Sequence, residues 1–221
     1  MFTPDGRTLA VGSGDGVARL WSIPGLLLLG HKSAVTSLAF SPNGRLLATG
    51  SEDNACQLWD VSDVAHPRPL WLSKTGHSGS VSAMAFSPDN RILATSGIDS
   101  KVQLWDVTAP TSPAPLGHPL QLATKYGSPV LFSPDGRKLV TANDDRTLQL
   151  WDIRNPANPV RIGQPIPGNP SNGNSAAFSP DSRVLAVSND DSTVQLWNIT
   201  APRTRPASGR LLPVTPSRCC P

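Results

Sequence analysis

Five segments of this 221-residue chain repeat one pattern, in which a phenylalanine is followed 19 residues later by a tryptophan. The phenylalanines and tryptophans that mark the copies are, in chain order, Phe2, Trp21, Phe40, Trp59, Phe86, Trp105, Phe132, Trp151, Phe178 and Trp197. The last four copies recur every 46 residues, and the first precedes the second by 38 residues. A fixed period of this length is the signature of a repeat protein, in which each copy folds as one unit and packs on its neighbours.

Each copy is patterned as short strands joined by turns. In the third copy, the segments 81–86, 92–95 and 102–105 alternate apolar and polar residues with the period of two that is typical of half-buried strands. In the turn Ser133-Pro134-Asp135-Gly136 of the fourth copy, Pro presets φ and Gly supplies a left-handed residue that closes a hairpin. A Pro-rich linker follows each Trp and leaves room for an edge strand, where Pro is tolerated. Each copy therefore predicts four strands.

Two kinds of dipeptide recur at fixed places in these copies. Gly-His pairs stand at Gly30-His31 and Gly76-His77, and Trp-Asp endings stand at Trp59-Asp60, Trp105-Asp106 and Trp151-Asp152. With the four-strand copies, they make the chain resemble the WD-repeat family of β-propellers. Linkers such as "PLGHPL" are most similar to those of bacterial WD-repeat arrays. The resemblance implies an all-β propeller of four-stranded blades, with about five repeats and an incomplete first one.

The resemblance spans residues 1–200, with copies at about 1–22, 30–60, 76–106, 122–152 and 168–198. Residues 201–221 form a basic, Pro-rich tail, in which we expect one outer strand near 209–213 followed by disorder. The first copy lacks its Gly-His and most of its first strand. We therefore expect the chain to be a fragment of a longer array, or the product of a truncated reading frame, that self-associates or needs further blades to close a ring.

The resemblance also implies a hydrogen-bonded set in each blade, made of a His, a Ser or Thr, an Asp and the Trp indole N–H. Two copies hold all four residues: His31, Thr49, Asp53 and Trp59, and His77, Thr95, Asp99 and Trp105. The fourth copy keeps Thr141, Asp145 and Trp151, the fifth keeps Asp191 and Trp197, and the first keeps Asp15 and Trp21.

A hydroxyl, a His and an Asp also suggest a hydrolase. A catalytic triad occurs once, around a cleft, whereas these residues recur at the repeat spacing and end on an indole that can only donate. We interpret the set as structural and expect no catalytic residue, no metal site and no cofactor. The alternative is a propeller hydrolase or lyase with its site in the central channel, which needs ionisable residues on the innermost strands. Those segments read "AVTSLAF", "SVSAMAF", "GSPVLFS" and "NSAAFSP" and hold none.

The charge of the chain argues against a nucleic-acid partner. The net charge of +3 comes from four Arg in residues 201–221, whereas residues 1–200 hold 15 Lys and Arg against 16 Asp and Glu. The longest purely aliphatic run, residues 26–29, is too short to cross a bilayer. We expect a cytoplasmic protein that binds proteins or peptides, as a scaffold or sensor in a bacterial signalling system. A non-functional remnant is the third interpretation. The candidate partner-binding positions are Lys32, Glu52, Ile98, Asp144 and Asp190.

Overall fold

The computed structural model describes residues 1, 3–4, 8–21, 26–74, 76–123, 129–143, 145, 147–167, 176–188, 193–200, 205–206 and 212–213. The described residues form strands and turns without a helix. The strands in chain order are β1 (Leu9–Gly12), β2 (Ala18–Trp21), β3 (Leu26–Leu28), β4 (Val35–Phe40), β5 (Leu46–Ser51), β6 (Ala55–Asp60), β7 (Arg68–Lys74), β8 (Val81–Phe86), β9 (Ile92–Gly97), β10 (Lys101–Asp106), β11 (Ala114–Gln121), β12 (Val130–Phe132), β13 (Lys138–Ala142), β14 (Thr147–Asp152), β15 (Val160–Pro167), β16 (Ala176–Phe178), β17 (Val184–Ser188), β18 (Thr193–Asn198), β19 (Arg205–Pro206) and β20 (Leu212–Pro213).

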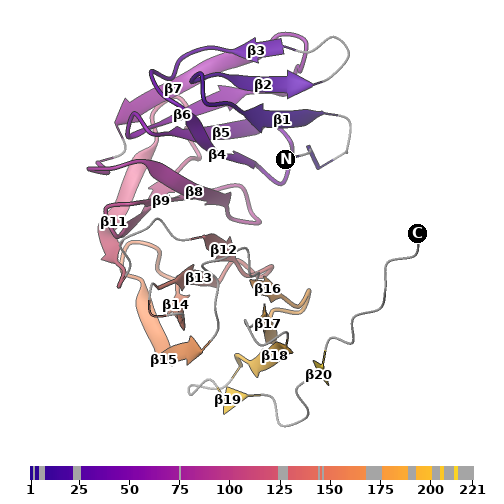
Figure 1. Cartoon of the computed structure of the whole chain (residues 1–221), viewed down its shortest axis with the longest axis vertical. Helices are drawn as coiled ribbons and strands as arrows, with labels where there is room; N and C mark the ends of the chain where they lie inside the picture. The colour runs from indigo at the N-terminus through magenta and orange to yellow at the C-terminus, as the bar shows by residue number, and fades with distance from the viewer. Residues whose placement is uncertain are drawn as a thin grey trace, which may run out of the picture.

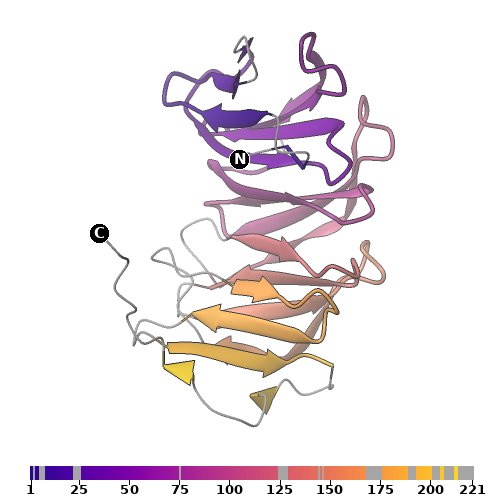
Figure 2. The same ribbon diagram turned by 90° about the vertical axis from the view of Figure 1, so that its right-hand side faces the viewer.

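These strands form five antiparallel sheets, in which consecutive strands pair, except that β20 pairs with β18 rather than with β19. Sheet 1 is β1–β3, sheet 2 is β4–β7, sheet 3 is β8–β11, sheet 4 is β12–β15 and sheet 5 is β16–β20. The sheets follow one another in chain order along an open arc, with sheets 1 and 5 at its two ends (Figures 1 and 2). The first strands of sheets 2, 3 and 4 contact one another, and β11 and β15 lie on the convex side of the arc (Figure 1). The predicted all-β architecture of four-stranded units is confirmed.

The core lies between the sheets, in four clusters. The Trp of one sheet packs against Ala and Leu side chains of the sheet before it, as Trp59 does against Ala10 and Leu20 and Trp105 against Ala48 and Leu58. Trp151 and Trp197 lie in the corresponding clusters between sheets 3 and 4 and between sheets 4 and 5. A sheet therefore buries its two faces only by stacking, which is why the copies depend on their neighbours.

In sheets 2 to 5, the turns between the first two strands have the predicted left-handed residue, at Gly44, Asn90, Gly136 and Ser182. Gly136 is left-handed, with φ of 69°, and Ser182 takes the same conformation, with φ of 59°. In this turn Ser133 Oγ donates to Asp135 Oδ1 at 2.5 Å, and the same Asp oxygen accepts the Arg137 N–H at 3.0 Å. The Ser and Asp side chains thus hold the turn closed.

The tail holds two short strands rather than one. β19 and β20 both pair with β18, and β20 lies within the predicted segment 209–213. Residues 209–211 and 214–221 lie outside the described residues. Within the described part of the chain, no helix has the length and apolarity needed to span a bilayer.

Candidate functional site

Sheets 2 and 3 each bring their four predicted network residues together. In sheet 3, His77 Nδ1 lies 2.9 Å from Asp99 Oδ1, and His77 Nε2 lies 3.0 Å from Thr95 Oγ1. A carboxylate only accepts, so the proton is on Nδ1, and Nε2 accepts the Thr95 hydroxyl. The Thr95 oxygen in turn accepts the Trp105 indole N–H at 3.1 Å. Each donor in this chain of contacts therefore has an acceptor.

The network in sheet 2 has the same order of contacts. His31 Nδ1 lies 3.3 Å from both Asp53 carboxylate oxygens, and His31 Nε2 lies 2.7 Å from Thr49 Oγ1. The Trp59 indole donates to Thr49 Oγ1 at 3.2 Å. Thr49 is fully buried, so its hydroxyl and the groups around it are withdrawn from water. A hydroxyl held between a ring nitrogen and an indole inside the sheet is placed to join strands rather than to attack a substrate.

The Asp of each network also fixes the loop that enters the sheet. Asp53 accepts the backbone N–H of Lys32 at 2.7 Å and that of Ala55 at 3.0 Å. Burial raises the pKa of the Asp53 carboxyl, but these two N–H groups and the His31 imidazole outweigh it, so the pKa lies below its usual value. Asp99 is held in the same way by the Ser78 N–H at 3.0 Å, and its pKa is also lowered against the effect of burial. Through these hydrogen bonds the ionised Asp connects the entering loop to the turn between the second and third strands.

Sheet 4 retains only half of the network. The Trp151 indole donates to Thr141 Oγ1 at 3.0 Å. Asp145 is exposed and accepts the N–H and the hydroxyl of Thr147. Leu122 and Ala123 stand where the other copies have Gly-His, so the imidazole that would link Thr141 to Asp145 is missing. The prediction placed Asp145 in the network, and here it closes its own turn instead.

The two end sheets depart further from the prediction. In sheet 5, Trp197 is buried, and its indole nitrogen has no partner among the described residues, because Val187 replaces the hydroxyl residue. Asp191 lies outside the described residues. In sheet 1, Trp21 is 59% exposed, and Asp15 pairs with Arg19 at 2.5 Å. The Arg19 guanidinium lowers the pKa of Asp15 to about 2. The prediction of a network in sheet 1 is wrong for both residues, because Val11 stands at the position of the hydroxyl residue and no described sheet covers Trp21.

Sequence reasoning missed a buried Gln on the third strand of sheets 2 to 4. Gln57, Gln103 and Gln149 lie opposite the network Thr of their sheets and are buried. Gln103 donates to the Leu104 carbonyl at 2.7 Å, and Gln149 makes the equivalent contact at 2.9 Å. A Cβ on Gly30 would lie 2.3 Å from Gln57 Oε1, so Gln57 explains why glycine precedes His31. Each of these Gln residues opens a repeated Gln-Leu-Trp tripeptide, and this repetition was the signal in the sequence that could have identified them.

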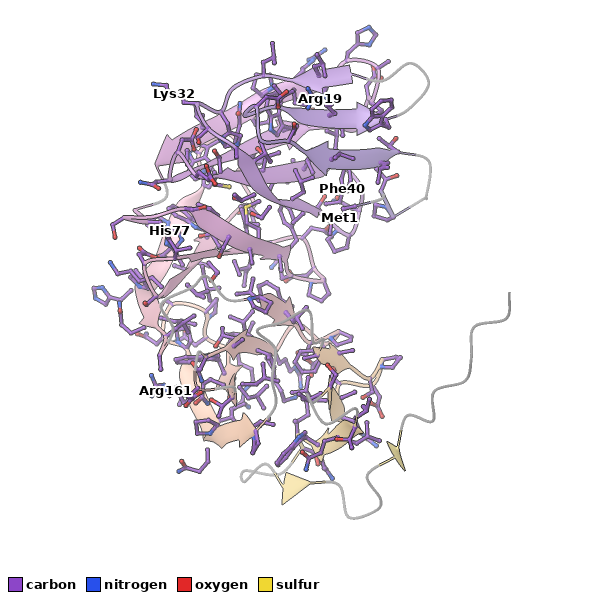
Figure 3. All side chains as sticks on the ribbon, viewed as in Figure 1. Met1, Arg19, Lys32, Phe40, His77 and Arg161 are labelled. Atoms are coloured by element: carbon purple, nitrogen blue, oxygen red, sulfur yellow. The ribbon has the colours of Figure 1, made fainter. Side chains whose placement is uncertain are left out.

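The candidate partner-binding positions lie beside the network on the outside of the molecule. Lys32 and Glu52 are exposed, and Ser33 Oγ donates to Glu52 Oε2 at 3.1 Å. Ile98 is 47% exposed and rests on Gly79, where a Cβ would lie 2.5 Å from Ile98 Cγ1. Figure 3 shows Lys32 on the side of the molecule that also carries His77, opposite Met1 and Phe40. Asp144 and Asp190 lie outside the described residues. We call Lys32, Glu52 and Ile98 the loop face.

The other side of the molecule carries a groove of about 1200 Å³ lined by turns of sheets 1 to 3. Its charged lining residues are Arg45 and Asp60, and Asp60 already accepts the N–H and hydroxyl of Ser62. Among the described residues that line this groove there is no His and no Cys. The described residues also contain no group of three or more side chains that could hold a metal ion.

The family model described as WD domain, G-beta repeat matches residues 1–22, 25–60, 70–106, 128–152 and 166–198, which is more than half of the chain. No curated protein matches the sequence. Among solved structures, a chain in the crystal structure of a mitotic checkpoint complex is similar, with a TM-score of 0.74 and 21% sequence identity, covering 99% of this chain and 67% of that chain. At this identity the likeness shows the fold alone. The chain therefore belongs to the WD-repeat family, and its five stacked sheets, with their buried networks, are the blades of a β-propeller.

Proposed function

We propose that this chain is a non-catalytic scaffold or sensor module that binds a protein or peptide on its loop face, in the cytoplasm and as part of a bacterial signalling system. WD-repeat membership supports protein binding as the general role. The near-neutral repeat region, with 15 Lys and Arg against 16 Asp and Glu in residues 1–200, favours a protein partner over nucleic acid.

One observation carries the proposal: on the loop face, each Asp that holds a loop in place directly follows a residue whose side chain is exposed. Asp53 and Asp99 point inward and hold the loops in place, whereas the residue directly before each of them, Glu52 and Ile98, is exposed. Because the Asp fixes the turn backbone, its neighbour presents an exposed side chain at a defined place, Glu52 beside Ser33 and Ile98 on Gly79. The exposed residue before the Asp is acidic in sheet 2 and aliphatic in sheet 3. The loop face therefore has a polar part and an apolar part, as protein-binding patches do.

Site-specific photocrosslinking tests the loop face directly. A photoreactive phenylalanine derivative at Ile98 is compared with the same residue at Val160, which is also an exposed aliphatic position but belongs to the edge strand of sheet 4. We expect a protein to be captured from position 98 and not from position 160, and its purified form to bind the parent chain. Ile98→Arg and Glu52→Lys should each weaken that binding at least about tenfold. Capture of the same proteins at both positions, or binding unchanged in both variants, would refute the assignment.

A further inference from the structure

Neighbouring sheets meet through the same pair of residues at every junction of the array. A Leu of one sheet, on β2 in sheet 1 and on the third strand of sheets 2 to 4, lies in one cluster with the Trp of the next sheet. The four pairs are Leu20 with Trp59, Leu58 with Trp105, Leu104 with Trp151, and Leu150 with Trp197. Each of these Leu side chains is at most 2% exposed, and each of these Trp side chains is at most 8% exposed. Sheets 2 to 4 thus each have a Trp face that packs on the sheet before it and a Leu face that packs on the sheet after it.

At the first end of the arc, the Trp face of sheet 1 is uncovered. Trp21 is 59% exposed, although its counterparts inside the array are buried. The register pairs Trp21 with Leu9, and Arg19 with Val11 and Leu27, so these five side chains share one face, while Leu20 points to sheet 2. Val11 and Leu27 are also exposed. The one charge on this face, on Arg19 of the central strand β2, is neutralised by Asp15, so the face is apolar around one ion pair.

At the other end of the arc, the Leu face of sheet 5 is uncovered. Leu196 occupies the position of Leu150 in sheet 4 and is 39% exposed. It pairs across the strands with Ala186, as Leu150 pairs with Val140, and Val194 lies on the same face two residues before it. Trp197 points the other way and is buried against sheet 4. Leu196, Ala186 and Val194 therefore form the kind of surface that a Trp face covers at every interior junction.

We propose that a second copy of this chain covers these surfaces, with the Trp21 face of one copy packing on the Leu196 face of the next. The two faces are the unmatched halves of a contact that the chain already forms four times, so their shapes and residue types fit each other. Exposed apolar patches of this kind mark sites of association. Because the two faces differ, the contact is head-to-tail, and it grows into a chain or ring of copies rather than a symmetric dimer. The proposal uses the sheet ends and is independent of the loop face.

Two variants that each block one end provide the test. Trp21→Arg removes the Trp face and Leu196→Arg removes the Leu face, whereas Leu72→Arg places the same charge at an exposed Leu on the edge strand of sheet 2 and serves as the control. Mass is followed by light scattering coupled to size exclusion, over a series of protein concentrations. Circular dichroism and urea denaturation check that each variant folds. Where Trp21→Arg lowers the urea midpoint, Val11→Arg on the same face takes its place.

We expect the parent and Leu72→Arg to form oligomers whose mass rises with concentration. Each end-blocked variant alone should be a monomer, with its dissociation constant raised at least about tenfold. An equal mixture of the two end-blocked variants should form a dimer that grows no further, because each copy supplies the face that the other lacks. A parent that stays monomeric at every concentration would overturn the proposal. A Leu196→Arg variant that still dimerises through Trp21 would show a symmetric contact and overturn it as well.

Discussion

Replacing Thr95 by valine removes one hydroxyl that serves two buried partners. Thr95 is fully buried, donates to His77 Nε2 at 3.0 Å and accepts the Trp105 indole N–H at 3.1 Å. Valine has nearly the same shape, so the packing around residue 95 changes little. The imidazole nitrogen and the indole N–H, however, both lose their partner inside the sheet. The substitution therefore isolates the energetic value of the network from that of the core.

Each buried polar group left without a partner costs about 1–3 kcal/mol of stability. Two such groups, less the gain from a more apolar side chain, give an expected loss of about 2–4 kcal/mol for Thr95→Val. Domains of this kind are stable by only about 5–15 kcal/mol, so the loss is a large fraction of the total. Thr95→Ser keeps the hydroxyl and removes one methyl group, so its cost should be about 1 kcal/mol.

Urea denaturation followed by tryptophan fluorescence and far-UV circular dichroism measures these differences. The opposite substitution can be made in sheet 5, where Val187 stands at the position equivalent to Thr95 and the Trp197 indole N–H has no partner among the described residues. Val187→Thr offers that indole an acceptor, so we expect stability to be unchanged or raised by up to about 1 kcal/mol. A stability loss below about 0.5 kcal/mol for Thr95→Val would refute the view that the hydroxyl stabilises the fold through its buried partners, and so would equal losses for Thr95→Val and Thr95→Ser.

Three further predictions follow from other contacts. The pKa of Asp99 is lowered in the folded state, so its stabilising effect is present above its unfolded pKa and is lost as the pH falls through the lower folded value. The stability difference between the parent and Asp99→Asn, from urea denaturation at several pH values, should therefore be constant near neutrality and shrink in acid. Ser182 has a φ of 59° and accepts the Asp135 N–H of the preceding sheet at 3.0 Å. Ser182→Ala should be less stable than Ser182→Gly by about 1 kcal/mol in thermal unfolding, because both lose the bond but only glycine relieves the left-handed strain. A Cβ on Gly97 would lie 2.6 Å from both His77 Nδ1 and Asp99 Oδ1, so Gly97→Ala should cost about 1–3 kcal/mol, whereas Gly14→Ala, with open space around it, should change the urea midpoint little.

The regular spacing of Phe and Trp was enough to predict the sheets, because each strand of a blade is short and closed by local turn chemistry. The turn at Ser133 to Gly136 depends only on neighbouring residues, and such local rules can be read directly from the sequence. The network residues of sheets 2 and 3 could be named for a similar reason, since the copies align position by position. The prediction of the full network held in the two copies that contain all four residues.

What the sequence did not predict depends on contacts outside the local turn, with another sheet or with the loop that enters the same sheet. Trp21 has the same place in its copy as Trp59, yet only Trp59 has another sheet to pack on, so the pattern alone assigned both to a buried network. Asp145 likewise has the expected place in its turn, but without an imidazole beside it the carboxylate turns to Thr147. Gln57 was overlooked because a polar residue on an alternating strand reads as solvent-facing, and its burial comes from the close approach of Gly30.

In each turn one residue holds the loop backbone and the residue before it is exposed, which explains how a repeat protein varies its surface without losing its fold. In sheets 2 and 3 the same Asp holds the loop backbone, although the residue before it changes from Glu52 to Ile98. A change at the exposed position leaves the Asp contacts intact, so it alters recognition at little cost in stability. A change at the Asp itself releases the loop and shifts every exposed group on it. Specificity in this chain therefore belongs to the positions at which the copies differ, and the positions at which they agree determine where those differences are displayed.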